Sequence, residues 1–189
     1  MTRIHSPDLP SCTLDNASAT PPPPPTGTPA VTLTDIATFR PAPGTDHMEP
    51  DGWAVAGLDT NFYAVAAPQT VPGTLLGRPA EVRFTAVGFH WDYGDGATVA
   101  RGTPGGTWEQ LRVPEFDPTP TSHVYAAEGD FTIHLRIDYR AEYSFDGPAF
   151  VPIDGTIPLP ANDLRITVGD AKTVLVNHDC ATAPAGPGC

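Results

Sequence analysis

The sequence has 189 residues, of which 24 are proline and 18 are glycine. Because both residues break helices from within, this composition excludes a helical bundle or a coiled coil. The 22 acidic and 10 basic residues give a net charge of −12, which argues against nucleic-acid binding. The sequence contains no run of 18 apolar residues, so it predicts no membrane-spanning helix.

The first 30 residues form a proline-rich segment that we expect to be disordered. Pro21–Pro25 is an unbroken proline run, which favours a polyproline II spacer, and recognition of this run by a proline-binding partner is the alternative. Residues 1–10 contain no apolar stretch of the kind found in a secretion signal. We therefore expect either an export signal upstream of this sequence or a cytosolic protein.

The three cysteines, Cys12, Cys180 and Cys189, all lie outside the apolar middle of the chain. Their place in segments rich in Pro, Gly and Thr predicts an oxidising compartment, with one disulfide and one unpaired thiol. A bridge between Cys180 and Cys189 would close the loop between them, and pairing of Cys12 with either of them is the alternative. We expect residues 179–189 to form a flexible tail.

Residues 31–61 hold the first predicted strands. Val31–Thr34 is a short alternating strand, and a loop rich in proline and glycine follows it. Trp53–Leu58 and Asn61–Ala66 are apolar stretches of strand length bounded by Gly and Asp. We interpret residues 31–61 as an N-terminal extension that packs on the main domain.

Strict alternation of apolar and polar residues is clearest in three later segments, Glu81–Val87, Phe131–Tyr139 and Leu164–Val168. Alternation with period two places one set of side chains on each face of a strand, one packed and one solvated. Several such strands separated by Gly and Pro turns predict an all-β fold, an antiparallel sandwich or barrel. Thr173–Val176 is the last predicted strand, at a sheet edge.

Two motifs carry most of the information. In Phe89–Gly96, aromatic residues alternate with polar ones, and a Gly-Asp-Gly turn follows in which the carboxylate can accept backbone N–H groups. In His123–Leu135, a tyrosine precedes a glycine that opens a long alternating strand, as in the tyrosine corner of immunoglobulin-like sandwiches. The residues that define the pair are Trp91, Asp92, Gly94, Asp95, Gly96, His123, Tyr125 and Gly129.

Together these motifs resemble the polycystic kidney disease (PKD) domain, whose pattern is Trp-Asp-Phe-Gly-Asp-Gly followed by His-x-Tyr-x-x-x-Gly-x-Tyr-Thr-Val. Here Tyr93, Phe131 and Ile133 replace the Phe, Tyr and Val of that pattern. The resemblance implies an immunoglobulin-like antiparallel β-sandwich over residues 62–178, with a tryptophan in its core. The segment Ala97–Ser122 is longer than the corresponding connection in the family, so we expect a long loop insertion there.

The resemblance also implies a location outside the cell or at the cell surface, and a role in protein binding, adhesion or structural spacing. The residues themselves favour a non-enzymatic protein, because the sequence has no Gly-x-Ser-x-Gly motif and no phosphate-binding loop.

We expect no cofactor. Calcium is the alternative, because Asp92 and Asp95 can supply oxygen ligands. Their spacing lacks the dense acidic pattern of a calcium loop, so we prefer a structural role in which both carboxylates accept turn amides and bind the segment at His123.

Trp53 and Trp108 are the candidate binding residues. Trp108 lies on the long insertion, and an exposed aromatic ring can stack on a glycan or anchor a protein partner. The alternative is that both indoles fold over the sandwich as lids. Two further functions stay open: a carbohydrate-binding module that uses an exposed tryptophan, and a component of a pilus or envelope assembly in which a strand edge pairs with a partner.

Overall fold

The computed structural model describes residues 30–171 and residue 181. The chain divides into two units at the boundary between Ala30 and Val31, and every element below belongs to the second unit. Apart from Ala30 and Ala181, the predicted proline-rich segment and cysteine-containing tail lie outside the described residues, as do all three cysteines and the strand expected at Thr173–Val176.

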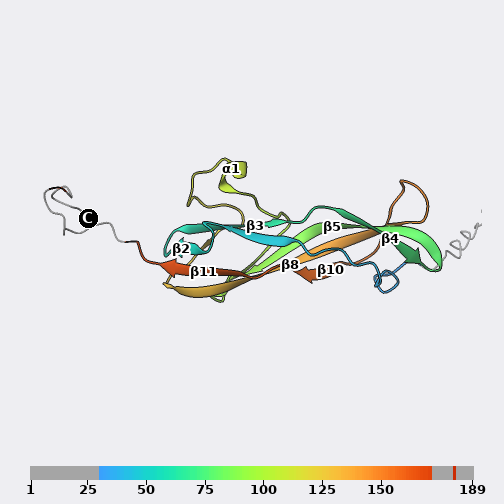
Figure 1. The fold of residues 1–189 in the computed structure, drawn as a ribbon, viewed down its shortest axis with the longest axis horizontal. Coiled ribbons are helices and arrows are strands. Elements are labelled where there is room, and N and C mark those ends of the chain that lie inside the picture. The colour runs from blue at the N-terminus through green and yellow to red at the C-terminus, as the bar shows by residue number, and fades with distance from the viewer. Residues whose placement is uncertain (1–29, 172–180, 182–189) are drawn as a thin grey trace, which may run out of the picture. The chain divides into compact units, whose positions relative to one another are not determined.

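The described part of the chain is built from strands and one short helix, and it is all-β as the alternation predicts (Figure 1). The elements in chain order are β1 (Thr45–Glu49), β2 (Trp53–Val55), β3 (Asp59–Val65), β4 (Gln69–Leu75), β5 (Arg78–Asp92), β6 (Thr98–Arg101), α1 (Trp108–Leu111), β7 (His123–Val124), β8 (Gly129–Ser144), β9 (Val151–Pro152), β10 (Ile157–Pro160) and β11 (Leu164–Gly169). The smaller sheet has the order β1-β3-β7. The larger sheet has the order β2-β11-β8-β5-β4, with β6 paired to β5, and with β9 and β10 paired to β8.

The side chains of the long strands alternate between core and solvent. In β8, Ile133, Leu135 and Ile137 are buried, whereas His134 and Arg136 are exposed. β5 and β11 follow the same alternation. Buried residues of β1 and β3 belong to the same core cluster as those of β5, β8 and β11, which is consistent with a β-sandwich.

β5 is a single long strand that contains two of the segments singled out in the sequence. Glu81–Val87 and the aromatic part of Phe89–Gly96 follow each other in β5, which pairs with β8 along most of its length. The register shifts between Ala86 and Gly88, so Val87 is the extra residue of a β-bulge. Because of this extra residue, the apolar side chains before the bulge and the aromatic side chains after it point to the same face of β5 and pack in the same core.

Residues 31–61 form part of both sheets rather than an added extension. β1 pairs with β3, and β2 runs parallel to β11 with Trp53 opposite Thr167. The boundary expected between residues 61 and 62 falls inside β3. The physical reason is that one sheet cannot bury its apolar face alone, and β1 and β3 supply the layer that covers it.

The strand predicted at Val31–Thr34 is wrong, because the chain forms turns over residues 33–38. The Asp35 carboxylate accepts hydrogen bonds from Thr32 N–H at 2.8 Å and from Thr32 Oγ1 at 2.7 Å, and Asp35 N–H donates to the Thr32 carbonyl. Local bonds of this kind compete with a sheet ladder. Ile36 within the turns is buried, so this segment still contributes to the core.

The insertion expected as a long loop at Ala97–Ser122 contains two regular elements. β6 pairs back on β5 immediately after the glycine turn. The single turn of α1 begins with a capping box, in which Thr107 Oγ1 accepts from Gln110 N–H and the Gln110 side chain accepts from Thr107 N–H. One helical turn is too short to leave a helical period in the sequence.

Candidate functional site

The side chain of Trp91 lies between the two sheets. Trp91 belongs to β5 of the larger sheet and is only 1% exposed. Its Nε1–H donates a hydrogen bond of 3.1 Å to Oδ1 of Asp46 on β1 of the smaller sheet. Phe89, on the same face of β5, packs against it with ring centroids 5.9 Å apart. The expectation of a core tryptophan is therefore confirmed, and this residue joins the two layers directly.

Asp46 is a buried carboxylate that the sequence analysis missed. Its Oδ1 also accepts from His47 N–H, whereas Oδ2 has no hydrogen-bond partner among the described residues. Burial raises the pKa of Asp46 to about 7, although the hydrogen bonds from Trp91 and His47 oppose this shift. No sequence pattern marks this role: in Thr45–Glu49 the buried residues are Asp46 and Met48, and a carboxylate between two polar neighbours does not look like a core residue.

The turn after β5 uses both of its aspartates as hydrogen-bond acceptors. Oδ1 of Asp92 accepts from Gly94 N–H, and Oδ1 of Asp95 accepts from Ala97 N–H, each at 3.0 Å. Asp95 Oδ2 lies 2.7 Å from Nε2 of His123. Partial burial raises the pKa of Asp95, but the hydrogen bonds from Ala97 and His123 outweigh it, so the pKa lies below its ordinary value. Both carboxylates thus accept turn amides, as the preferred structural role requires, whereas only Asp95 contacts His123.

The second motif meets the first at the ring of His123. This ring stacks on Tyr93 with centroids 4.3 Å apart and meets the edge of Tyr125 at 4.7 Å. The hydroxyl of Tyr125 donates to the carbonyl oxygen of Tyr93 at 3.0 Å, and Gly129 then begins β8. Burial raises the pKa of both tyrosines, so both stay neutral donors. The fold thus brings together two motifs that lie apart in the sequence.

Within the part of the chain that the structure describes, no group of three or more His, Cys, Asp or Glu side chains is arranged to hold a metal ion. Calcium binding at Asp92 and Asp95 stays a prediction. Two further histidines each pair with one aspartate at 2.7 Å, His90 with Asp138 and His134 with Asp163.

The two glycines of the turn offer a matched test of how tightly it packs. Both have positive φ, but a Cβ at Gly94 would lie 2.5 Å from the Thr132 carbonyl oxygen, whereas a Cβ at Gly96 meets nothing within 4 Å. We expect Gly96→Ala to lower the free energy of unfolding by about 1–2 kcal/mol through backbone strain alone. Gly94→Ala should lower it by about 2–4 kcal/mol, because the β8 backbone must also move. Urea unfolding measures both, and equal losses would show that β8 does not pack against the turn.

Trp108 is buried, with 6% of its surface exposed, and so is not presented to a glycan or a partner. It is the first residue of α1. Its backbone N–H donates to Oε2 of Glu49 at 2.8 Å, and its Nε1–H donates to the carbonyl oxygen of Asp117 at 3.2 Å. This buried position agrees with the alternative that Trp108 folds over the sandwich as a lid. A long connection needs such an apolar anchor to stay ordered.

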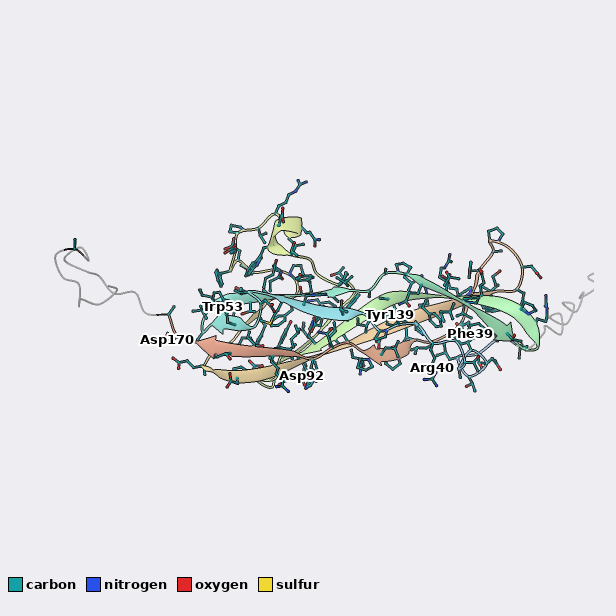
Figure 2. All side chains as sticks on the ribbon, in the orientation of Figure 1. Phe39, Arg40, Trp53, Asp92, Tyr139 and Asp170 are labelled. Atoms are coloured by element: carbon teal, nitrogen blue, oxygen red, sulfur yellow. The ribbon has the colours of Figure 1, made fainter. Side chains whose placement is uncertain are left out.

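Trp53 is 48% exposed, at the end of the larger sheet where β11 finishes (Figure 2). Its ring leans on Phe116 with centroids 6.1 Å apart, and Phe116 in turn contacts Trp108 at 5.4 Å. Phe116 has φ of +63°, a left-handed conformation that is strained for a bulky side chain. The insertion thus places Phe116 in tilted contact with Trp53, the ring that the sequence analysis named as a candidate for binding.

A polar hollow of about 550 Å³ lies beside β2, on the outer face of β8 and β11. The residues with polar side chains that line it are Asp130, Thr132, Arg165 and Thr167, and Gly52 closes it next to Trp53. Oδ1 of Asp130 accepts a hydrogen bond of 2.7 Å from the Thr167 hydroxyl. Among the described residues, Arg165 forms no salt bridge.

A larger hollow of about 610 Å³ lies further along the same outer face, over β6, β5, β8 and β10. Two of its lining side chains contact a neighbouring carboxylate: His90 lies 2.7 Å and Nε of Arg136 lies 3.6 Å from Asp138. Pro158 and Pro160 of β10 form its opposite wall. These contacts occupy two of the polar side chains that this hollow would otherwise offer to a ligand.

No family model matches the sequence, and no curated protein matches it. The class that the fold defines is an all-β protein with two sheets around one core. Among the described residues, no helix is long and apolar enough to cross a membrane.

Proposed function

We propose that the second unit of the chain is a PKD-like domain with an immunoglobulin-like sandwich fold. Support comes from the meeting of the two motifs, in which Asp95 contacts His123 and Tyr125 bonds back to Tyr93. The burial of Trp91 between the layers supports it as well. The parallel pairing of β2 with β11 and the insertion carrying α1 are additions to that pattern.

We further propose that the chain is a non-enzymatic module that acts outside the cell or at the cell surface by binding a partner. The observation that carries this function is Trp53, a large aromatic side chain that the fold leaves half exposed. Aromatic residues of this kind contribute strongly to binding because they combine a large contact area with few rotatable bonds. Strain at Phe116, which supports the ring, is a feature found more often at binding sites than elsewhere.

Assembly through a free strand edge has weaker support. On β1, Asp46 N–H donates to Oδ1 of Asn162 and Nδ2 of Asn162 donates to the Asp46 carbonyl, so this side chain occupies the free edge. β4 is an edge strand of the larger sheet, and Pro72 in the middle of it has no backbone N–H to donate to a partner strand. Both features are typical of strand edges that are protected against pairing.

Antibody labelling of the cells that make the protein tests the proposed location. We expect intact cells to be labelled as strongly as permeabilised cells. In cells that lack the native protein, added Trp53→Ala protein should be retained less than the parent, whereas Leu76→Ala, which changes an exposed side chain at the β4–β5 turn, should be retained normally. Labelling that needs permeabilisation would refute a surface function, and equal retention of both variants would refute binding through Trp53.

A further inference from the structure

We infer that the partner bound at Trp53 is a neutral polysaccharide built of pyranose sugars, and that the hollow of Asp130, Thr132, Arg165 and Thr167 binds its hydroxyl groups. This inference rests on the proposed surface-binding function and names the ligand class for it. It joins two neighbouring features of the larger sheet: the half-exposed indole on β2, and the polar hollow over β8 and β11.

The register of the sheet places the two features on one side. Trp53 is opposite Thr167 across the β2–β11 pair, and the next pair, Ala54 and Val168, is buried. Cross-strand partners point to the same face of a sheet, so the side chains of Trp53 and Thr167 leave the backbone on the same side. The indole itself turns to Phe116 and adjoins the hollow through Gly52 rather than lining it. Thr167 N–H also donates to the Gly52 carbonyl at 3.1 Å, and both residues line the hollow.

The indole is held in place before any ligand arrives. Phe116 contacts Trp53 with the two rings tilted by 51°, and its other neighbour is the buried Trp108, whose Nε1–H is bonded to the Asp117 carbonyl. A ring that is already oriented loses little conformational entropy when a flat ligand stacks on it. The apolar C–H face of a pyranose ring is such a ligand.

The hollow offers both hydrogen-bond donors and hydrogen-bond acceptors, which suits the hydroxyl groups of a sugar better than it suits a ligand with a single charge. Oδ1 of Asp130 accepts from Thr167, and its other carboxylate oxygen can accept from a sugar hydroxyl. The guanidinium of Arg165 is exposed and can donate to sugar oxygens, and the Thr132 hydroxyl can do either. Sugars present donors and acceptors on neighbouring carbons, which is the mixture that these side chains satisfy.

Charge decides between neutral and acidic polysaccharides. The chain carries a net charge of −12, whereas within the hollow the carboxylate of Asp130 and the guanidinium of Arg165 balance each other. An anionic polymer would be repelled by the protein as a whole, and the hollow offers it no net positive charge in return. A neutral polysaccharide avoids this repulsion and still offers its ring face and its hydroxyl groups.

The test uses the full chain in native gels that contain one soluble polysaccharide each: hydroxyethyl cellulose, xylan, mannan, glucan or, as the acidic comparison, polygalacturonate. We expect at least one neutral polymer to retard the parent protein. Trp53→Ala should weaken that binding at least tenfold, Asp130→Ala and Arg165→Ala severalfold, and Trp53→Phe should retain part of it. The matched control Leu76→Ala, whose side chain is 60% exposed on a strand turn remote from β2 in the sheet order, should bind as the parent does.

Tryptophan fluorescence gives a second readout that does not depend on retardation. The other two tryptophans of the chain, Trp91 and Trp108, are buried, so quenching by acrylamide reports on Trp53. The binding polymer should protect the parent from quenching and leave the quenching of Trp53→Ala unchanged. Thermal unfolding of each variant shows that it is folded.

Three results would overturn the inference: no retardation by any neutral polymer, retardation by polygalacturonate alone, or binding that Trp53→Ala leaves intact. A chain that is found on the cell surface and retained there through Trp53 but binds no polysaccharide would support the proposed function and indicate a protein partner. A chain found inside the cell would refute the proposed function whatever the gels show.

Discussion

Replacing Trp91 with alanine is expected to lower the free energy of unfolding by about 3–5 kcal/mol, as large-to-small changes of buried aromatic residues do. The indole is 1% exposed and fills the space between β5 and β1. Its removal leaves a cavity lined by residues of both sheets, because a packed core relaxes only partly. It also removes the N–H donor of Asp46, whose Oδ2 already has no partner among the described residues.

Urea unfolding followed by circular dichroism measures this loss. Trp53→Ala is the matched control, because it removes the same side chain from a half-exposed site and should lower stability by less than about 1 kcal/mol. Trp91→Phe should fall between the two, since it keeps a ring but loses the hydrogen bond. A Trp91→Ala variant as stable as Trp53→Ala would mean that the two sheets do not pack around this indole.

Replacing Asp46 with asparagine is expected to stabilise the protein above pH 7 and to flatten its dependence on pH. The folded pKa of about 7 lies above the ordinary value of 3.8, so between these values the folded state binds more protons than the unfolded chain. Stability from this group is therefore greatest below pH 4 and falls as the pH rises towards 7. Each pKa unit corresponds to about 1.4 kcal/mol, so the full effect is up to about 4 kcal/mol.

The physical reason is that ionised Asp46 is buried with one oxygen unpaired, and asparagine has no charge to bury. Unfolding in urea at pH 5, 6, 7 and 8 measures the parent and the variant side by side. The stability of the variant relative to the parent should rise from pH 5 to pH 7 and change little above that, because the parent loses the stability of this group as the pH rises towards 7. Parallel curves across this range would show that Asp46 does not titrate between pH 5 and 8.

Much of the fold could be predicted because alternation is a local property of a strand. The buried sets of β5, β8 and β11 are the ones that the pattern indicates, and the Gly-Asp-Gly turn forms where those residue types favour it. Local reasoning was wrong at Val31–Thr34, where Asp35 accepts hydrogen bonds from Thr32 and a turn replaces the strand. The sequence analysis treated residues 31–61 as an added extension because they precede the segment that resembles the PKD domain, but β1 and β2 belong to the two sheets.

The candidate site was only partly visible in the sequence. Trp53 and Trp108 both stand out there, and Trp108 does so more because it lies on the long insertion. Their opposite exposures arise from packing: α1 turns Trp108 inward against Glu49 and Asp117, while Trp53 lies on an edge strand. The hollow beside Trp53 joins residues of β8 and β11, and no local pattern marks such a juxtaposition.

The sequence by itself determined the all-β class, the faces of the long strands and the position of the glycine turn. Each of these follows from residue spacing and backbone preference within a few positions of the chain. The tertiary structure alone decided that β1 and β3 form the covering layer, that Asp46 accepts from Trp91, and that Phe116 supports Trp53. These contacts join residues far apart in the chain, and their formation depends on burying apolar surface across the whole fold rather than on any local preference.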